Sequence, residues 1–235
     1  MTTIILVHSP LLGPFTWSLV ANELRRRDVV VIVPDLHGEG VDEERPYHQQ
    51  HAQNSANALK TLPTNEPIML VAHSGAGPLL PAIRQQLCQP IAAYLFVDAG
   101  VAQDGQSRLD MLAEELPEMA PQLHKLLASG QRWPQWRDED LAEAIPDAKL
   151  RQRLLAELTS QPLEFFEEPI PVFAAWPDAP CIYLQLSAAY DYSTMEARRR
   201  GWLCGRLDGS HFHMLVDETA VANIILQILA HFVSE

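Results

Sequence analysis

Within the first hundred residues, short apolar runs alternate with amphipathic stretches, and this alternation constrains the fold more than any other feature. The apolar runs suit strands buried on both faces, and the stretches between them have helical spacing. Strands that alternate with helices form βαβ units with right-handed crossovers, and such units build a parallel sheet. We therefore predict strands at 3–8, 29–34, 68–73 and 91–97, and helices at 15–27, 49–61 and 78–87.

The pattern changes between residues 103 and 168, where helical segments separated by prolines contain no strand-like run. We predict a helical cap there, inserted after the fourth strand, and an extended return path through the proline-rich residues 162–180. The expected fold class is α/β, a mostly parallel sheet flanked by helices. Its core comprises residues 1–102 and 169–235, with further strands at 181–186 and 202–207 and helices at 195–200 and 220–233.

Composition narrows the possible partners and the compartment. The net charge of −13 and the scarcity of basic clusters disfavour nucleic acid and anionic membranes as partners. No apolar run reaches the ~20 residues of a membrane span, and the N-terminus does not resemble a signal peptide. Cys88, Cys181 and Cys204 form no CxxC pair, which argues against disulfides and structural zinc. We expect a cytoplasmic protein that acts on a small molecule, and a homodimer remains open.

Residues 70–77 (LVAHSGAG) carry the chemistry, because a buried strand ends there at a serine and a helix begins at once. The spacing matches small-x-Ser-x-small, a loosened form of the Gly-x-Ser-x-Gly nucleophile elbow. Ala72 and Ala76 flank Ser74 and let strand and helix approach closely. Such a turn exposes the serine hydroxyl and aims the Gly75 amide at the reaction centre. An ordinary strand-to-helix turn that contains a serine is the alternative.

Further motifs occur in a fixed order along the chain. Residues 4–10 (IILVHSP) end an apolar strand, residues 34–40 (PDLHGEG) follow the next one, and the elbow comes after them. Residues 96–98 (FVD) and 209–212 (GSHF) complete the series. In these motifs and their order the chain resembles the α/β-hydrolase superfamily over nearly its whole length. The resemblance implies a Ser-His-acid triad in the chain order Ser, acid, His.

By this resemblance Ser74 is the nucleophile and His211, in the Gly-x-His loop, is the base. His213 lies two residues further and competes for that role, or lines the pocket together with His73. For the acid, the usual family position matches Asp191, after the strand at 181–186, and we favour it. Asp98, at the end of the strand at 91–97, is the alternative acid.

The oxyanion hole is where the chain departs most from the family. The Gly75 amide supplies one donor, but Pro10 has no N–H where the family usually has the second. The Leu11 amide or the Ser9 hydroxyl are the nearest replacements. A hydroxyl residue after the strand-ending histidine also resembles the hydroxynitrile-lyase branch of the superfamily.

We therefore expect a serine hydrolase without cofactor or metal that cleaves a carboxylic ester or thioester of a small, largely apolar substrate. Two alternatives stay open. The chain could be a lyase or another proton-transfer enzyme on the same fold, or a non-catalytic protein that binds small molecules.

Overall fold

A computed structural model describes residues 2–38 and 45–233, and within these ranges six strands form one sheet. The strand order is β2-β1-β3-β4-β5-β6, and all neighbours are parallel. All six predicted strands are present, although β2, at one edge, pairs with β1 over two residues only. The strands are β1 (Thr3–Val7), β2 (Val31–Ile32), β3 (Ile68–Ser74), β4 (Ile91–Ala99), β5 (Cys181–Gln185) and β6 (Leu203–Arg206).

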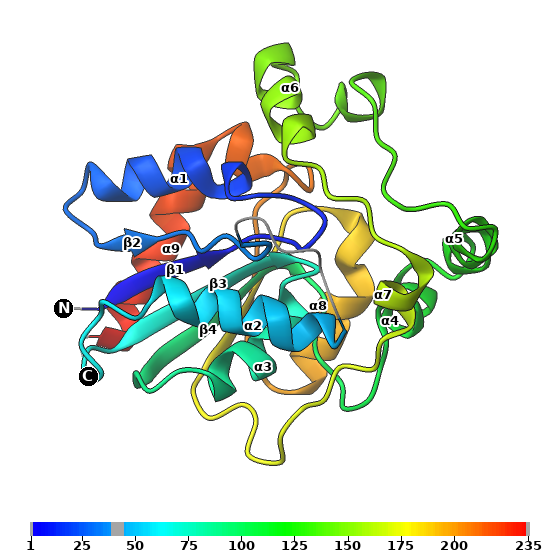
Figure 1. Cartoon of the computed structure of the whole chain (residues 1–235). Helices are drawn as coiled ribbons and strands as arrows, with labels where there is room; N and C mark the ends of the chain where they lie inside the picture. The colour runs from blue at the N-terminus through cyan, green and yellow to red at the C-terminus, as the bar shows by residue number, and fades with distance from the viewer. Residues whose placement is uncertain (1, 39–44, 234–235) are drawn as a thin grey trace.

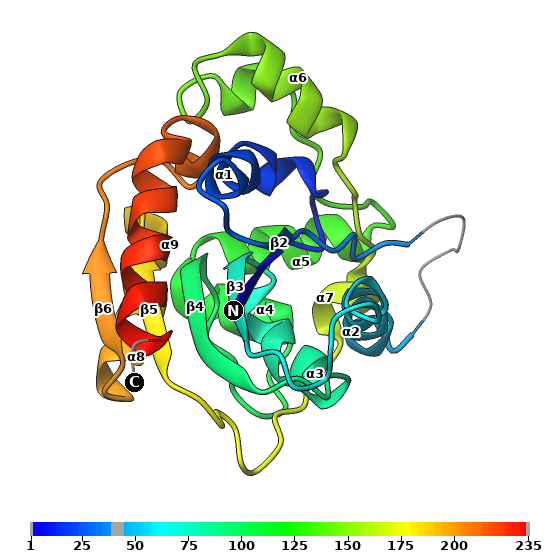
Figure 2. The ribbon, with the colours of Figure 1, turned by 90° about the vertical axis from the view of Figure 1, so that its left-hand side faces the viewer.

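Helices cover both faces of the sheet (Figures 1 and 2). On one face lie α1 (Phe15–Arg25) and α9 (Glu218–Val233), which contact each other. The other face carries α2 (Tyr47–Ala58), α3 (Leu80–Gln85) and α8 (Asp191–Arg199). This three-layer arrangement is the predicted fold class.

The strand residues divide between two hydrophobic clusters with the period of two that a pleated strand imposes. In β1, Ile4 and Leu6 pack on the side of α1 and α9, whereas Ile5 and Val7 pack on the side of α2 and α3. All four side chains are buried, and burial of one such side chain stabilises the fold by roughly 1.5–3 kcal/mol. The continuous apolar run at residues 3–7 therefore reflects a strand that is covered on both faces.

Four helices lie between β4 and β5: α4 (Arg108–Glu115), α5 (Met119–Ala128), α6 (Ala148–Ala156) and α7 (Leu163–Glu167). The residues of α7 fall in the stretch predicted to be extended, so that prediction is wrong there. The reason is burial, because Phe165 and Phe166 pack with Leu123 and Leu127 of α5, and a helical turn brings both rings onto that cluster.

The segment between β4 and β5 is also hydrogen-bonded to the loop that follows β1. Glu157 accepts a hydrogen bond from the amide of Phe15 at 2.7 Å, at the start of α1. The amide of Thr159 donates to the Leu11 carbonyl at 3.1 Å. A carboxylate at a helix N-terminus satisfies a free amide and interacts favourably with the helix dipole. These two contacts fix the loop after β1, which borders the site described below.

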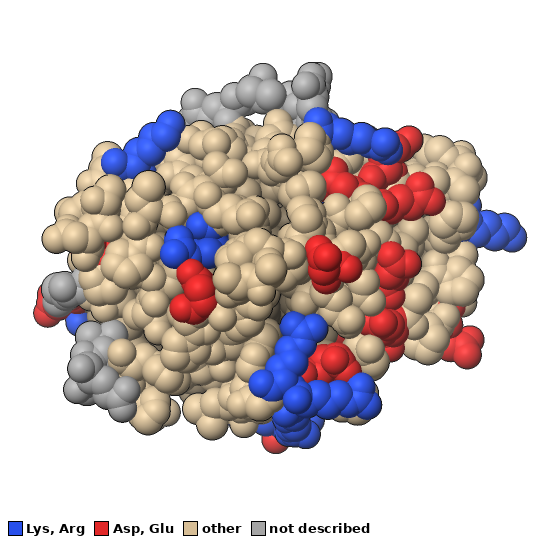
Figure 3. All heavy atoms as spheres, turned by 90° about the horizontal axis from the view of Figure 1, so that it is seen from below, with Lys and Arg blue, Asp and Glu red and all other residues tan. Residues whose placement is uncertain are grey.

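Charges are unevenly spread over the face shown in Figure 3, where acidic side chains gather on one side and much of the remaining surface is uncharged. Among the described residues, no helix is both long and apolar enough to span a membrane.

Candidate active site

Ser74 is the last residue of β3 and has a φ of 58°, in the left-handed region that non-glycine residues rarely adopt. The sequence predicts this sharp turn, and the flanking Ala72 and Ala76 are fully buried. At Gly77 there is no room even for a Cβ atom, which would overlap the carbonyl oxygen of Gly100. The close approach of strand and helix holds the backbone of Ser74 in its strained conformation.

Asp98 lies beside this turn because the pairing of β3 with β4 shifts by one residue. His73 pairs with Val97 and Ser74 pairs with Ala99, which leaves Asp98 as the extra residue of a bulge. Its φ is 40°, again in the left-handed region. A bulge re-aims the side chain that it carries, and here it turns the carboxylate toward the end of β5.

The carboxylate of Asp98 is fully buried and accepts four hydrogen bonds. Oδ1 accepts from the amides of Leu186 at 2.6 Å and Ser187 at 3.1 Å. Oδ2 accepts from the Ser187 hydroxyl at 2.6 Å and lies 3.2 Å from Nδ1 of His211. Burying a carboxylate is costly unless its oxygens are satisfied, and the residues after β5 supply three of these four donors.

Asp191, the preferred acid in the sequence analysis, does not reach His211 in the structure. It is exposed at the first position of α8, and its Oδ1 accepts from Nε2 of Gln185 at 2.5 Å. The carboxylate beside His211 belongs to the alternative candidate, Asp98. The reason is the β3–β4 bulge, which a strand-by-strand interpretation of the sequence does not contain.

The position of His211 is fixed through its backbone as well as its ring. Nε2 of His73 donates to the His211 carbonyl at 2.9 Å, and the two rings lie 4.4 Å apart. Burial holds the pKa of His73 well below its usual value, so His73 stays neutral and donates from Nε2. Contact with Asp98 places the His211 proton on Nδ1, which leaves Nε2 of His211 as the basic nitrogen.

His73 and His213 were both expected in the pocket, and the structure places them elsewhere. His73 is fully buried behind His211. The ring of His213 packs against Gly209, where an added Cβ atom would overlap it. Neither side chain is among the residues that line the cavity next to Ser74.

Tyr190 is a residue of the site that the sequence analysis missed. Its hydroxyl lies 3.1 Å from Oγ of Ser74. Its ring stacks on the His211 ring, with centroids 5.0 Å apart and planes 10° from parallel. The available signal was position, because Tyr190 follows β5 at the carboxyl edge of the sheet, one residue before the carboxylate that we favoured.

The loop after β1 brings the three predicted oxyanion donors together. Ser9 is buried, and its Oγ accepts from the Leu11 amide at 3.3 Å. A Cβ atom on Gly75 would lie 3.2 Å from the same Oγ, so the Ser9 hydroxyl directly adjoins the Gly75 backbone. The single proton of the Leu11 amide is thus directed at Ser9, and the Ser9 hydroxyl keeps its own proton for another acceptor.

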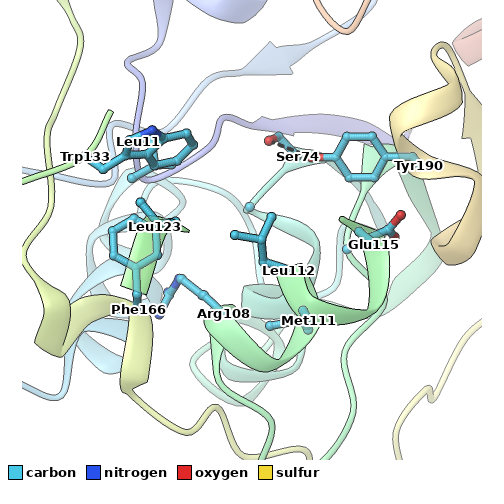
Figure 4. A pocket seen from close by; sticks show the side chains of 12 residues that line it. Leu11, Ser74, Arg108, Met111, Leu112, Glu115, Leu123, Trp133, Phe166 and Tyr190 are labelled. Atoms are coloured by element: carbon cyan, nitrogen blue, oxygen red, sulfur yellow. Dashed lines mark hydrogen bonds between the residues drawn. The ribbon is translucent and has the colours of Figure 1, made fainter. Parts of the chain in front are cut away.

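A cavity of about 150 Å³ opens beside Ser74 (Figure 4). Helix α4 turns one face toward it, with Arg108, Met111, Leu112 and Glu115 at the helical spacing i, i+3, i+4 and i+7. A capping box at the preceding Ser107 fixes where α4 begins. The remaining lining residues, mostly apolar or glycine, are Leu11, Ser74, Gly75, Gly100, Leu123, Trp133, Phe166 and Tyr190.

The two charged side chains that line this cavity, Glu115 and Arg108, both contact neighbouring residues. Oε1 of Glu115 accepts from the amide of Ser193 at 2.8 Å and also from its hydroxyl. Burial raises the pKa of Glu115. Arg108 donates to the Phe165 carbonyl at 3.0 Å, and its guanidinium lies 3.8 Å from the centre of the Phe165 ring. Within the described ranges, no group of His, Cys, Asp and Glu side chains could hold a metal ion.

Comparison with known proteins identifies the family. The sequence pattern of the alpha/beta hydrolase family matches residues 4–224, which is nearly the whole chain. The chain belongs to the alpha/beta hydrolase family. This alpha/beta hydrolase is also similar to the putative chloroplastic methylesterase 14 of Arabidopsis thaliana, with 26% identity over 116 residues. That match covers 48% of the chain and 33% of the methylesterase, so it spans a third of the length of the curated relative.

Solved structures agree with the fold. An extracellular alpha/beta-hydrolase from a Paenibacillus species, described as a structural and functional homologue of tobacco salicylic acid binding protein 2, superimposes with a TM-score of 0.78. It shares 20% identity, over 97% of this chain and 98% of its own. A methylesterase from Arabidopsis superimposes with a TM-score of 0.71 at 16% identity, over 98% of this chain and 100% of its own. Tomato methylketone synthase I with bound 2-tridecanone gives 0.71 at 14% identity, over 98% of both chains.

Proposed function

We propose that this alpha/beta hydrolase cleaves carboxylic esters or thioesters of small, largely apolar molecules, with Ser74 as nucleophile, His211 as base and Asp98 as orienting acid. One arrangement carries the proposal. The strained Ser74 lines an apolar cavity, and Tyr190 contacts both this serine and His211. Nδ1 of His211 is held in turn by the buried carboxylate of Asp98. Such an arrangement activates a hydroxyl for attack on a carbonyl carbon.

In acylation, Oγ of Ser74 forms a bond to the carbonyl carbon while its proton passes to Nε2 of His211. The buried Asp98 carboxylate keeps the other ring proton on Nδ1 and stabilises the imidazolium. The tetrahedral intermediate collapses when the bond to the leaving oxygen breaks and that oxygen takes the proton from Nε2. Water then hydrolyses the acyl-enzyme by the same proton transfers in reverse order.

Two groups are placed to bind the oxyanion of the intermediate. The Gly75 amide follows the nucleophile directly, as in other nucleophile elbows. The Ser9 hydroxyl replaces the amide that Pro10 lacks, because it adjoins Gly75 and receives the Leu11 N–H. A hydroxyl that accepts a hydrogen bond becomes a better donor itself.

The cavity supports a substrate with a compact apolar acyl part, since half of its twelve lining residues are leucine, methionine, tryptophan or phenylalanine. The names of the relatives favour a simple alkyl ester, because the curated match and one similar structure are methylesterases. We propose a methyl or short alkyl ester as the substrate.

The test compares the wild type with Ser74→Ala on p-nitrophenyl butyrate and on a panel of methyl esters. We expect hydrolysis by the wild type and a loss of at least 10³-fold in kcat for the variant, as for other triad nucleophiles. The unfolding temperature serves as the control for folding. If neither protein hydrolyses any ester while both bind apolar acids equally well, a binding protein or a lyase replaces this proposal.

A further inference from the structure

Tyr190 makes contacts that the proposed triad does not require. Its hydroxyl is hydrogen-bonded to the nucleophile Ser74, and its ring lies parallel to that of His211. The backbone carbonyl of Tyr190 accepts from the Thr194 hydroxyl at 2.8 Å, within the first turns of α8. The side chain is therefore held at the reaction centre from the β5 side of the sheet.

The phenol of Tyr190 keeps its proton under ordinary conditions. Burial raises its pKa, and the nearby carboxylates of Asp98 and Glu115 act in the same direction. A phenol in such surroundings is a hydrogen-bond donor and not a base. In the free enzyme its hydroxyl shares a hydrogen bond with Oγ of Ser74, in which either oxygen can be the donor.

The two sides of Ser74 carry different groups. Figure 4 shows Leu11, from the loop after β1, and Tyr190 on opposite sides of Ser74. The oxyanion donors Ser9 and Gly75 belong to the side of Leu11. His211 shares the other side with Tyr190, because their rings are stacked. In a tetrahedral intermediate the oxyanion faces its donors and the leaving oxygen faces the imidazolium, so the leaving oxygen also faces Tyr190.

We propose that Tyr190 is a further catalytic residue, whose hydroxyl moves its hydrogen bond from Ser74 to the leaving oxygen as the ester bond breaks. This inference rests on the proposed ester hydrolysis. The C–O bond pair goes to the leaving oxygen, which takes its proton from Nε2 of His211. Tyr190 donates a hydrogen bond and retains its own proton. The proton that the leaving oxygen needs comes from His211 alone.

The consequence is a dependence on the alcohol. An alkoxide leaving group develops strong negative charge and needs a donor, whereas p-nitrophenolate disperses its charge over the ring. Tyr190 should therefore matter for methyl esters and much less for p-nitrophenyl esters of the same acid.

The experiment measures kcat/KM for methyl butyrate and p-nitrophenyl butyrate with the wild type and Tyr190→Phe. Both substrates form the same acyl-enzyme, and kcat/KM reports the steps through acylation alone. We expect the variant to lose about 10- to 100-fold on methyl butyrate, the size of one hydrogen bond to a charged group, and less than about 3-fold on p-nitrophenyl butyrate. Phenylalanine keeps the ring that stacks on His211.

Tyr192→Phe is the matched control, because Tyr192 lies two residues further, in α8, and its hydroxyl interacts with Glu114 and Gln103. It should leave both values unchanged. Equal losses on the two esters, or no loss, would overturn the role of Tyr190 while ester hydrolysis stands. A wild type inactive on both esters would instead overturn the proposed function, and this inference with it.

Discussion

The role of Asp98 can be tested by replacing it with asparagine, because the structure separates its two oxygens by function. Asparagine can keep its carbonyl oxygen toward the amides of Leu186 and Ser187, so the backbone contacts survive. Its NH2 group would then face Nδ1 of His211 in place of Oδ2. His211 would have to accept at Nδ1 and carry its proton on Nε2, which removes the base.

We expect Asp98→Asn to lower kcat on p-nitrophenyl butyrate by about 10⁴-fold, the loss caused by the wrong tautomer in a well-studied triad. The unfolding temperature should change little by comparison. The matched control is Asp191→Asn, which alters the partly buried contact with Gln185. The side chain of Asp191 is exposed, so this variant should keep activity within about 3-fold, in line with the small effects of most surface substitutions. A reversed result, with Asp191→Asn inactive and Asp98→Asn active, would refute the assignment of the acid.

Three further predictions follow from single contacts. Ser9→Ala should lower kcat by about 10²–10³-fold if its hydroxyl binds the oxyanion, measured on the same ester; near-normal activity would assign the second donor to a backbone amide. Gly77→Ala should destabilise the protein by roughly 1–3 kcal/mol in urea unfolding, because the added Cβ overlaps a backbone carbonyl, whereas Gly205→Ala, with 3.9 Å to its nearest neighbour, should not. Burial lowers the pKa of His8 to about 4, from 6.5 in an exposed histidine. Between pH 6.5 and about 4 the unfolded chain therefore binds a proton that the folded chain does not. The free energy of unfolding should fall by about 3 kcal/mol as the pH drops through this range. His8→Gln should flatten this dependence; an unchanged pH profile would contradict it.

Much of the fold follows from periodicity in the sequence. The apolar runs at 3–8, 68–73 and 91–97 correspond to β1, β3 and β4, because a strand covered on both faces must be apolar throughout. The prolines in residues 162–180 predict an extended chain, and this prediction is wrong for α7. The side chains of Phe165 and Phe166 pack against α5, and this packing favours a short helix there.

Parts of the site that depend on one local motif could be predicted from the sequence. Parts that depend on how neighbouring strands pair could not. The elbow at Ser74 needs only small neighbours, and those are visible in the sequence. The choice between Asp98 and Asp191 depends on a one-residue shift between β3 and β4, which no local pattern encodes. Tyr190 was missed for a related reason, since its contact with Ser74 spans 116 positions of the chain.

If Ser74 is an activated nucleophile, it should react covalently with a fluorophosphonate. The protein is incubated with a fluorophosphonate, digested, and the peptide that contains Ser74 is analysed by mass spectrometry. We expect one phosphonyl group per chain, attached to Ser74, and none in Asp98→Asn on the same time scale. An unlabelled Ser74 in the folded wild type, or label on another residue, would contradict it.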